Sequence, residues 1–297
     1  MDDLRQLAIE MRQKDDEKPE FCDFLLDYQE QYKKDTESVQ GKLYKEVVSK
    51  ALLKPSFSKL LALRPFFNPR AGVMELQSPE KDNKINEFLA TVWSSRPFQL
   101  VLAYLTKKQH PWTVDEKTFK EAIRHIWFGV YSRADRKLGS SGFEHVFLGE
   151  IVEKKMEVGG MHNWAIVHTH EVNKTDPLQY RGWIVKRADV IASGNFMWGR
   201  YEKKIGGFFL STSPSFDFAL LTLCFLTNRD DNRFQISVDG CEVEVQAYDL
   251  IQNTRAFIGT VYPETGKKSS TCDSEYKKRA KCCPNFQKDQ LKKQKTV

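Results

Sequence analysis

Two histidines, His145 and His162, lie 17 residues apart and could act on one phosphate together. In metal-free RNA cleavage, one imidazole takes the proton from the ribose 2′-OH and a second imidazole protonates the departing 5′ oxygen. The alternative is a pair of unrelated structural histidines, which is the commoner meaning of an arbitrary pair. The choice depends on the elements that would carry the two side chains.

The segment around the pair has the pattern of a β-hairpin. Residues 143–152 are rich in apolar β-forming residues and contain no proline, which predicts a strand, and residues 155–160 could pair back onto it. With the turn centred on residues 154–155, His145 is the diagonal neighbour of His162, roughly 7–8 Å away on the same face. A register shifted by one residue would move His145 to the other face.

Two acidic residues share the first predicted strand with His145. Glu144 and Glu150 stand among apolar residues that predict a strand covered on both faces; these are Val146, Phe147, Leu148 and Ile151. Carboxylates in such a strand need partners. Their presence beside a histidine favours a functional site over an ordinary core strand.

Four segments in order then resemble the EndoU family of uridylate-specific endoribonucleases. They read SSGFEHVFLGE, MHNW, YEKKIGGFFLSTSPSFDFALLTLCF and FIGTVY, and the resemblance runs from roughly Leu43 to Tyr262. It implies an α+β fold, in which a helical N-terminal lobe precedes a catalytic lobe of antiparallel β-sheets with helices. Residues 1–130 would form the helical lobe and residues 131–266 the β-rich catalytic lobe.

The resemblance implies a catalytic set of His145, His162 and Lys203. A fixed ammonium suits such a set because it stabilises the extra negative charge of a five-coordinate phosphorane. Charge alone does not distinguish Lys203 from Lys204. The family pattern selects Lys203, counted back from Ser213 and Pro214.

The resemblance also implies supporting residues. Thr260 and Tyr262 lie two apart on a predicted strand, hence on one face, and would line the site; the alternative is an ordinary strand end. Glu144 and Glu150 would orient an imidazole or help to hold a divalent ion, and the alternative is salt bridges to nearby lysines.

The chain departs from the family pattern at Gly207. Some relatives carry a serine four residues after the catalytic lysine, which is implicated in reading the uracil edge. Ser211 or Ser213 could substitute for it here. Uridine preference is therefore a weaker expectation than cleavage.

Metal binding has two interpretations. The resemblance implies a divalent activator, Mn²⁺ or Ca²⁺, with no organic cofactor and with unknown ligands. Independently, His162, His168 and His170 form an H-x5-H-x-H pattern that could ligate Zn²⁺ or Cu²⁺ if the segment were a strand. If residues 162–172 are a helix, as the resemblance favours, the histidine pattern no longer indicates a metal site.

The net positive charge of +6 is concentrated in the C-terminal segment. From Lys267 onward there are 10 Lys and Arg against 3 Asp and Glu, a net of +7, which leaves −1 on the preceding 266 residues. Residues 267–297 are therefore expected to be a basic, disordered tail that either attracts RNA phosphates or is simply solvated. Cys272, Cys282 and Cys283 lie in this tail without metal-ligand spacing.

Apolar periodicity predicts the remaining elements. Helices are expected at residues 4–11, 21–33, 43–53, 83–93, 97–105 and 115–129. Ser213 as N-cap, followed by Pro214, predicts a helix over residues 215–226. Asp239 and Gly240 predict a hairpin turn between two alternating strands, and residues 257–262 form the last strand.

The leading hypothesis is an endoribonuclease that cleaves single-stranded RNA at uridylates and leaves 2′,3′-cyclic phosphate and 5′-OH ends. The alternatives are a non-catalytic RNA-binding module on the same fold and a histidine-ligated metal protein. The chain is expected to be monomeric and has no apolar run long enough to span a bilayer. No signal peptide is evident at Met1, so the protein is expected in the cytoplasm or nucleus, or outside the cell if a signal has been removed.

Overall fold

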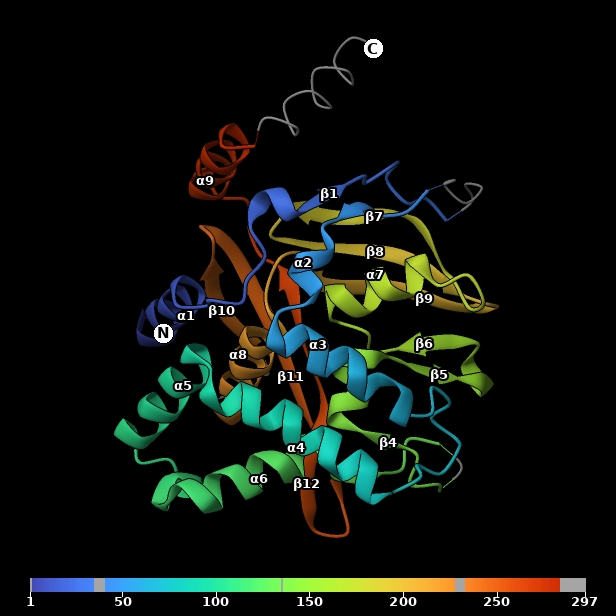
Figure 1. Ribbon diagram of the computed structural model, residues 1–297, viewed down its shortest axis with the longest axis vertical. Coiled ribbons are helices and arrows are strands. Elements are labelled where there is room, and N and C mark those ends of the chain that lie inside the picture. The colour runs from blue at the N-terminus through green and yellow to red at the C-terminus, as the bar shows by residue number, and fades with distance from the viewer. Residues whose placement is uncertain (1, 35–40, 135, 228–232, 284–297) are drawn as a thin grey trace.

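The computed structural model describes residues 2–34, 41–134, 136–227 and 233–283, which form an α+β fold (Figure 1). The helices are α1 (Asp2–Gln13), α2 (Ser49–Leu52), α3 (Pro55–Leu63), α4 (Pro79–Ser94), α5 (Arg96–Lys107), α6 (Glu116–Phe128), α7 (Trp164–Val172), α8 (Pro214–Thr227) and α9 (Ser270–Lys281). The strands are β1 (Phe24–Leu26), β2 (Tyr44–Val47), β3 (Val130–Tyr131), β4 (Ser140–Ser141), β5 (Glu150–Val152), β6 (Glu157–Gly159), β7 (Leu178–Arg187), β8 (Ile191–Trp198), β9 (Tyr201–Phe209), β10 (Arg233–Val238), β11 (Cys241–Gln252) and β12 (Arg255–Thr265).

Two larger sheets carry the second half of the chain. One has the strand order β5-β6-β9-β8-β7, antiparallel except where β6 meets β9 in parallel. The other is the antiparallel meander β10-β11-β12, whose long hairpin crosses the middle of Figure 1. Asp239 and Gly240 form its first turn with positive φ angles of 49° and 80°, as their sequence predicts.

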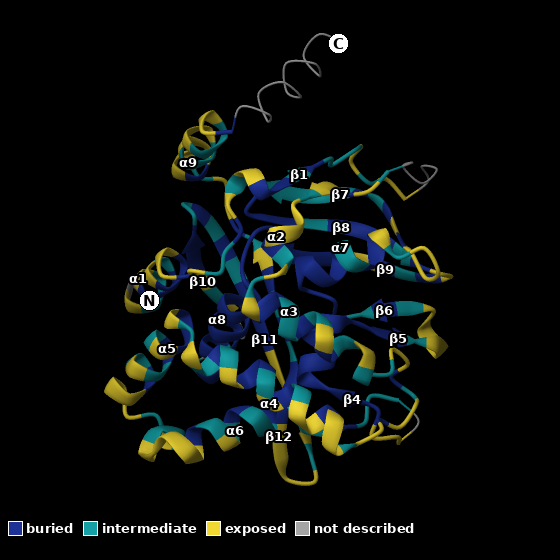
Figure 2. Cartoon of the chain, in the orientation of Figure 1, coloured by how far each residue is buried: buried dark blue, intermediate teal, exposed yellow. Residues whose placement is uncertain are grey.

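The helix α8 is the centre of the core and is almost wholly buried (Figure 2). Its N-terminus forms as predicted, because the Ser213 hydroxyl accepts a hydrogen bond from the Phe216 N–H at 3.0 Å. Phe218 stacks on Trp127 of α6 with ring centroids 4.6 Å apart. The contact joins the helices of the first half of the chain to the second half, and a single apolar cluster includes residues of both.

The helices predicted at residues 21–33 and 43–53 are wrong in large part. The chain instead forms the antiparallel pair β1 and β2, with Phe24 opposite Val47, and only the short helix α2 follows. Tertiary partners decide this, because the N–H groups of Leu43 and Tyr44 bond to the buried carboxylate of Glu171 at 2.7 and 3.1 Å. A local apolar pattern carries no information about partners that are distant in the chain.

The strand predicted over residues 143–152 is extended only in β5. The preceding residues form a π-helical turn, η4 (Glu144–Leu148), closed by a bond from the Gly149 N–H to the Glu144 carbonyl at 2.9 Å. A continuous apolar run does not distinguish a buried strand from a buried helical turn. The predicted hairpin register is confirmed where the strands exist, since Glu150 pairs with Gly159 and Val152 with Glu157.

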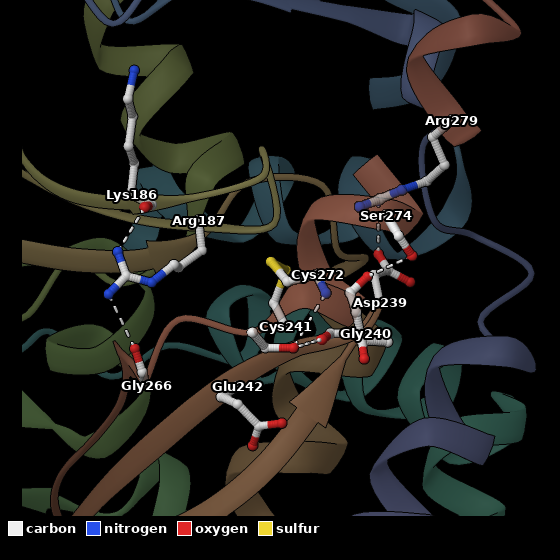
Figure 3. Close-up of a disulfide and its surroundings, with 12 residues drawn as sticks. Lys186, Arg187, Asp239, Gly240, Cys241, Glu242, Gly266, Cys272, Ser274 and Arg279 are labelled. Atoms are coloured by element: carbon white, nitrogen blue, oxygen red, sulfur yellow. Dashed lines mark hydrogen bonds and ion pairs between the residues drawn. A yellow bond between two sulfur atoms is a disulfide. The ribbon is translucent and has the colours of Figure 1, made fainter. Parts of the chain in front are cut away.

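Part of the expected disordered tail is helical. The helix α9 is attached to the body by disulfides Cys241–Cys272 and Cys22–Cys283. Figure 3 shows Arg279 of α9 directed at Asp239 beside the first disulfide, with 3.2 Å between guanidinium and carboxylate. The remaining tail, residues 284–297, lies outside the described residues. Within the described ranges, no helix combines the length and apolar character needed to cross a bilayer.

Candidate active site

The turn η4 and the loop after β6 bring the two histidines to one place. The N–H of Met161 donates to the carbonyl of His145 at 2.9 Å, and the N–H of His162 donates to the carbonyl of Val146 at 2.7 Å. Gly160 permits this approach, because a Cβ there would lie 1.6 Å from the His145 carbonyl oxygen. The proximity of the histidines, predicted from a hairpin, therefore arises from backbone bonds between a helical turn and a loop.

His145 is supported by a buried carboxylate. Its Nδ1 lies 2.7 Å from Oε2 of Glu150, the same oxygen that lies 3.2 Å from Nε of Arg133. Burial lowers the pKa of His145 well below its usual value of 6.5 and raises the pKa of Glu150 to about 7. One proton is therefore held between Nδ1 and the carboxyl group, and Nε2 is the nitrogen that remains for chemistry.

His162 is held by a backbone carbonyl and an aromatic ring. Its Nδ1 donates to the carbonyl oxygen of Gly207 at 2.7 Å, which leaves the lone pair on Nε2. Tyr262 stacks on the imidazole with centroids 4.7 Å apart and an interplanar angle of 14°. Burial and the nearby charge of Lys203 lower the pKa of His162 well below 6.5, so the ring is a neutral proton acceptor near pH 7.

Lys203 and Lys204 have different surroundings. Lys203 is 7% exposed, whereas the side chain of Lys204 is 66% exposed and pairs with Glu157. Burial lowers the pKa of Lys203 to about 8. Its charge lowers the pKa of both His145 and His162, so the structure brings Lys203 into the neighbourhood of both imidazoles.

Thr260 and Tyr262 are half-buried on the open face of β12. Tyr262 reaches the predicted site through its stack on His162, and Thr260 precedes it on the same face. Val261 and Pro263, between and beyond them, are buried on the opposite face. This alternation places both residues where the sequence pattern put them.

Glu144 lies apart from the other predicted residues. It lines a cavity of about 390 Å³ together with Arg64, His170 and Trp198, and that cavity is lined by none of His145, His162 and Lys203. Both carboxyl oxygens are buried without a hydrogen-bond partner, and burial raises the pKa of this group well above its usual value. Burial thus favours the neutral form of the Glu144 carboxyl group, which lies on the histidine turn but faces this cavity.

The structure explains the glycine at position 207. A Cβ at Gly207 would lie 2.6 Å from the carbonyl oxygen of Pro263, so a serine there has no room without moving β12. The proposed substitutes are engaged elsewhere. Ser211 lies 3.3 Å from a guanidinium nitrogen of Arg12, and Ser213 caps α8, both in the buried core.

The three histidines of the H-x5-H-x-H pattern do not converge. The resemblance predicted a helix here, and α7 confirms it. The ring of His168 contacts Tyr44, and the ring of His170 contacts Trp198, whereas His162 bonds to the carbonyl of Gly207. Over the described part of the chain, no group of three or more His, Cys, Asp or Glu side chains is placed to hold a metal ion.

Sequence reasoning missed two contributors. Arg133 was not among the candidate residues, yet it contacts Glu150 and donates to the hydroxyl of Ser140 at 3.1 Å. The carbonyl of Gly207 is a backbone group and leaves no signal in a sequence. A buried carboxylate needs a cation or donors, so Glu150 was the one available hint that a residue such as Arg133 existed.

The fold and site together define a class of protein. Two imidazoles have Nδ1 bound to a carboxyl or carbonyl oxygen, and a buried lysine lies near them; groups of these types can act as acid, base and charge stabiliser. The sequence model of the family described as Endoribonuclease XendoU matches residues 3–263. The chain belongs to this endoribonuclease family.

Known proteins resemble the chain in sequence and structure. Uridylate-specific endoribonuclease C of Xenopus laevis is 30% identical over 237 residues, which cover 77% of this chain and 76% of that protein. The uridylate-specific endoribonuclease of Paralichthys olivaceus is 31% identical over 75% of this chain, but the match spans only 58% of that protein. The solved structure of XendoU, described as a splicing independent snoRNA processing endoribonuclease, matches with a TM-score of 0.75 at 26% identity, over 89% of this chain and 97% of that one. The α+β fold predicted from the sequence is confirmed.

Proposed function

We propose that this protein cleaves single-stranded RNA at uridylates by attack of the ribose 2′-OH on the adjacent phosphate. The observation that carries the proposal is the pair of imidazoles held at Nδ1, by the Glu150 carboxyl and by the Gly207 carbonyl, with Lys203 acting on both. The preference for uridylates rests on the relatives named uridylate-specific.

The different supports of the two histidines suggest their roles. His162 is neutral and is held by an uncharged carbonyl, so its Nε2 is suited to take the proton of the 2′-OH. His145 acts as the acid when its Nε2 carries a proton in addition to the one shared between Nδ1 and Glu150. The Glu150 carboxyl group stabilises this form, so His145 is suited to protonate the leaving 5′ oxygen. Glu150 and Arg133 are then positioning residues.

The reaction balances without water. The 2′ oxygen forms a bond to phosphorus, the bond from phosphorus to the 5′ oxygen breaks, and the proton lost to His162 is matched by the proton given by His145. The products are a 2′,3′-cyclic phosphate and a 5′-OH. Lys203 stabilises the negative charge that the phosphorane carries between these steps.

Activation by Mn²⁺ or Ca²⁺ is an expectation from the family resemblance. The donors present do not fit an ion bound by side chains alone: Glu150 is committed to His145 and Arg133, and Glu144 faces a separate cavity that also contains Arg64. The proposed reaction therefore assigns no step to a metal ion.

The roles of Thr260 and Tyr262 are to line the site around His162.

The test is an RNA oligonucleotide with a single uridine, compared with the same oligonucleotide carrying 2′-deoxyuridine or 2′-O-methyluridine at that position. We expect cleavage of the first only, with mass spectrometry finding the cyclic phosphate on the upstream fragment. Cleavage after the 2′-deoxy residue, or a 5′-phosphate on the downstream fragment, would contradict the mechanism. Binding without any cleavage would favour the non-catalytic RNA-binding alternative.

A further inference from the structure

The open face of the β10-β11-β12 sheet continues outward from the proposed active site. Tyr262 of β12 lies opposite Gln246 of β11, and Gln246 lies opposite Arg233 of β10. Directly opposed residues of neighbouring strands share a face. A row therefore leads from His162 through Tyr262 and the buried Gln246 to Arg233, which is exposed.

A second aromatic residue lies beside this row. Tyr248 is opposite Thr260 and is 42% exposed. Its neighbour Ala247 is buried, as expected for side chains that alternate between the two faces of a strand. Its hydroxyl donates to Oε1 of Gln246 at 3.4 Å, and the Gln246 amide donates to Glu264 at 3.1 Å, so the side chain is directed along the strand toward the row. Tyr248 and Tyr262 are diagonal neighbours, roughly 7–8 Å apart.

Charge gives this surface a polarity. Glu244 and Glu264 face one another at one end of the open face, beyond the row. Their carboxylates disfavour an RNA phosphate there. Tyr248 and Thr260 lie at the other end, and this pair carries no carboxylate; the exposed Asp249 follows only after a shift in the strand register. A nucleic acid backbone would therefore leave the site past Tyr248, within reach of the Arg233 guanidinium, whose strand lies roughly 10 Å from β12.

We propose that Tyr248, Gln246 and Arg233, here called the flanking strip, form a subsite for the nucleotide that lies next to the cleaved dinucleotide. The base stacks on the exposed ring of Tyr248. The Gln246 side chain accepts a hydrogen bond from the hydroxyl of that ring, and Arg233 binds the phosphate of the flanking nucleotide. Base stacking on an aromatic ring tolerates any base, so the strip adds affinity for RNA length and not for a second specific base. The inference rests on the proposed function, because it extends the same site.

The test measures binding of uncleavable RNA of increasing length. The probes are a dinucleotide with 2′-O-methyluridine first and the same unit extended by two nucleotides on the 3′ side or on the 5′ side. For the unaltered protein, one extension should tighten binding, and Tyr248→Ala should remove roughly 5- to 150-fold of that gain. Tyr248→Phe should keep most of the gain, because it keeps the ring and loses only the bond from the hydroxyl to Gln246. Ile251→Ala, at an exposed residue of the same strand, is the control.

Arg233 has a separate readout in the salt dependence of binding. Loss of one phosphate contact should flatten the slope of log affinity against log salt by about 0.7 for a single strand. Arg233→Ala should show this change, and Arg255→Ala, at the exposed far end of β12, should not. Cleavage of the minimal dinucleotide of unmodified uridine should be the same in all these variants.

Two results would overturn the subsite. One is a gain on extension that is identical in Tyr248→Ala and the unaltered protein on both sides of the uridine. The other is an absence of any gain on extension in the unaltered protein. Failure of the proposed function looks different, since the unmodified dinucleotide would then not be cleaved at all.

Discussion

The two histidines of the site differ in what lies behind them. A carboxyl group supports His145, and an uncharged carbonyl supports His162. In the proposed mechanism this difference gives the two histidines separate roles, because the partner of Nδ1 affects how readily Nε2 gives or takes a proton.

The assignment of His145 as the acid can be tested by changing the leaving group of the substrate. His145→Ala should lower kcat on RNA by roughly 10²–10⁴-fold. The loss should be much smaller on uridine 3′-(4-nitrophenyl phosphate), because 4-nitrophenolate leaves without a proton. His162→Ala should lose activity on both substrates. Equal losses for His145→Ala on the two substrates would remove it from the role of acid.

Lys203 should set the alkaline limit of the reaction. Its pKa is lowered to about 8, so the ammonium is present below that pH and lost above it. We expect kcat/KM to fall as pH rises through about 8. Lys203→Arg keeps a charge at every pH used, so any remaining activity should lack this fall. An unchanged alkaline fall in the arginine variant would show that another group titrates.

At the scale of elements, the site depends on an irregular connection. The turn η4 ends at Gly149, with a φ of 84°, and the loop after β6 returns to it at Gly160 and Met161. Regular strands would place side chains by alternation alone. Here two hydrogen bonds from the loop to the carbonyls of His145 and Val146 fix the histidines instead.

Gly160→Ala tests that connection. A Cβ would overlap the His145 carbonyl, so we expect the bond from Met161 to break and kcat to fall by at least tenfold, about 1.4 kcal/mol in the barrier. Gly199→Ala is the matched control: its φ of 58° is close to the 64° of Gly160, but nothing lies within 4 Å of its Cβ. Steady-state kinetics with circular dichroism as a fold check would decide, and equal kcat in the two variants would contradict the argument.

At the scale of the whole molecule, the C-terminal helix joins parts that are far apart in sequence. The disulfide Cys22–Cys283 spans 261 residues and Cys241–Cys272 spans 31. Asp239, in the turn between β10 and β11, accepts from both Arg12 of α1 and Arg279 of α9. These contacts fasten α1 and α9 to the sheet that carries Tyr262.

Loss of the shorter disulfide should lower stability. Cys272→Ser should reduce the free energy of unfolding by about 3–4 kcal/mol, because the open loop gains entropy in the unfolded chain. Cys282→Ser should have little effect, since Cys282 is an exposed free thiol. Thermal unfolding of both variants without reductant measures the difference. Equal melting temperatures would mean that the disulfide does not form or does not stabilise.

The last residues of the chain offer a test of RNA attraction. Residues 284–297 contain four Lys and one Asp, a net of +3. Their deletion leaves both disulfides and α9 intact, and should flatten the salt dependence of RNA binding while kcat at saturating substrate stays the same. Binding isotherms at several salt concentrations measure this. A slope identical to that of the full chain would show that the segment does not contact RNA.

The resemblance of the sequence to a known family implied the α+β class. The sequence by itself determined the helices α4, α5, α6 and α8 and the turn at Asp239 and Gly240. Each of these follows from local information, namely apolar periodicity, an N-cap or a turn dipeptide. The register of β5 and β6 was also predictable, because it depends on a short connection.

The tertiary structure decided what depends on partners distant in the chain. The fold of residues 143–148 as a helical turn, the pairing of β1 with β2 and the position of Arg133 all have this origin. So does the glycine at position 207, which is required by the carbonyl of Pro263 and cannot be deduced from its neighbours. The sequence named His145, His162 and Lys203, but their protonation follows from burial and from the acceptors behind each ring, which exist only once the chain is folded.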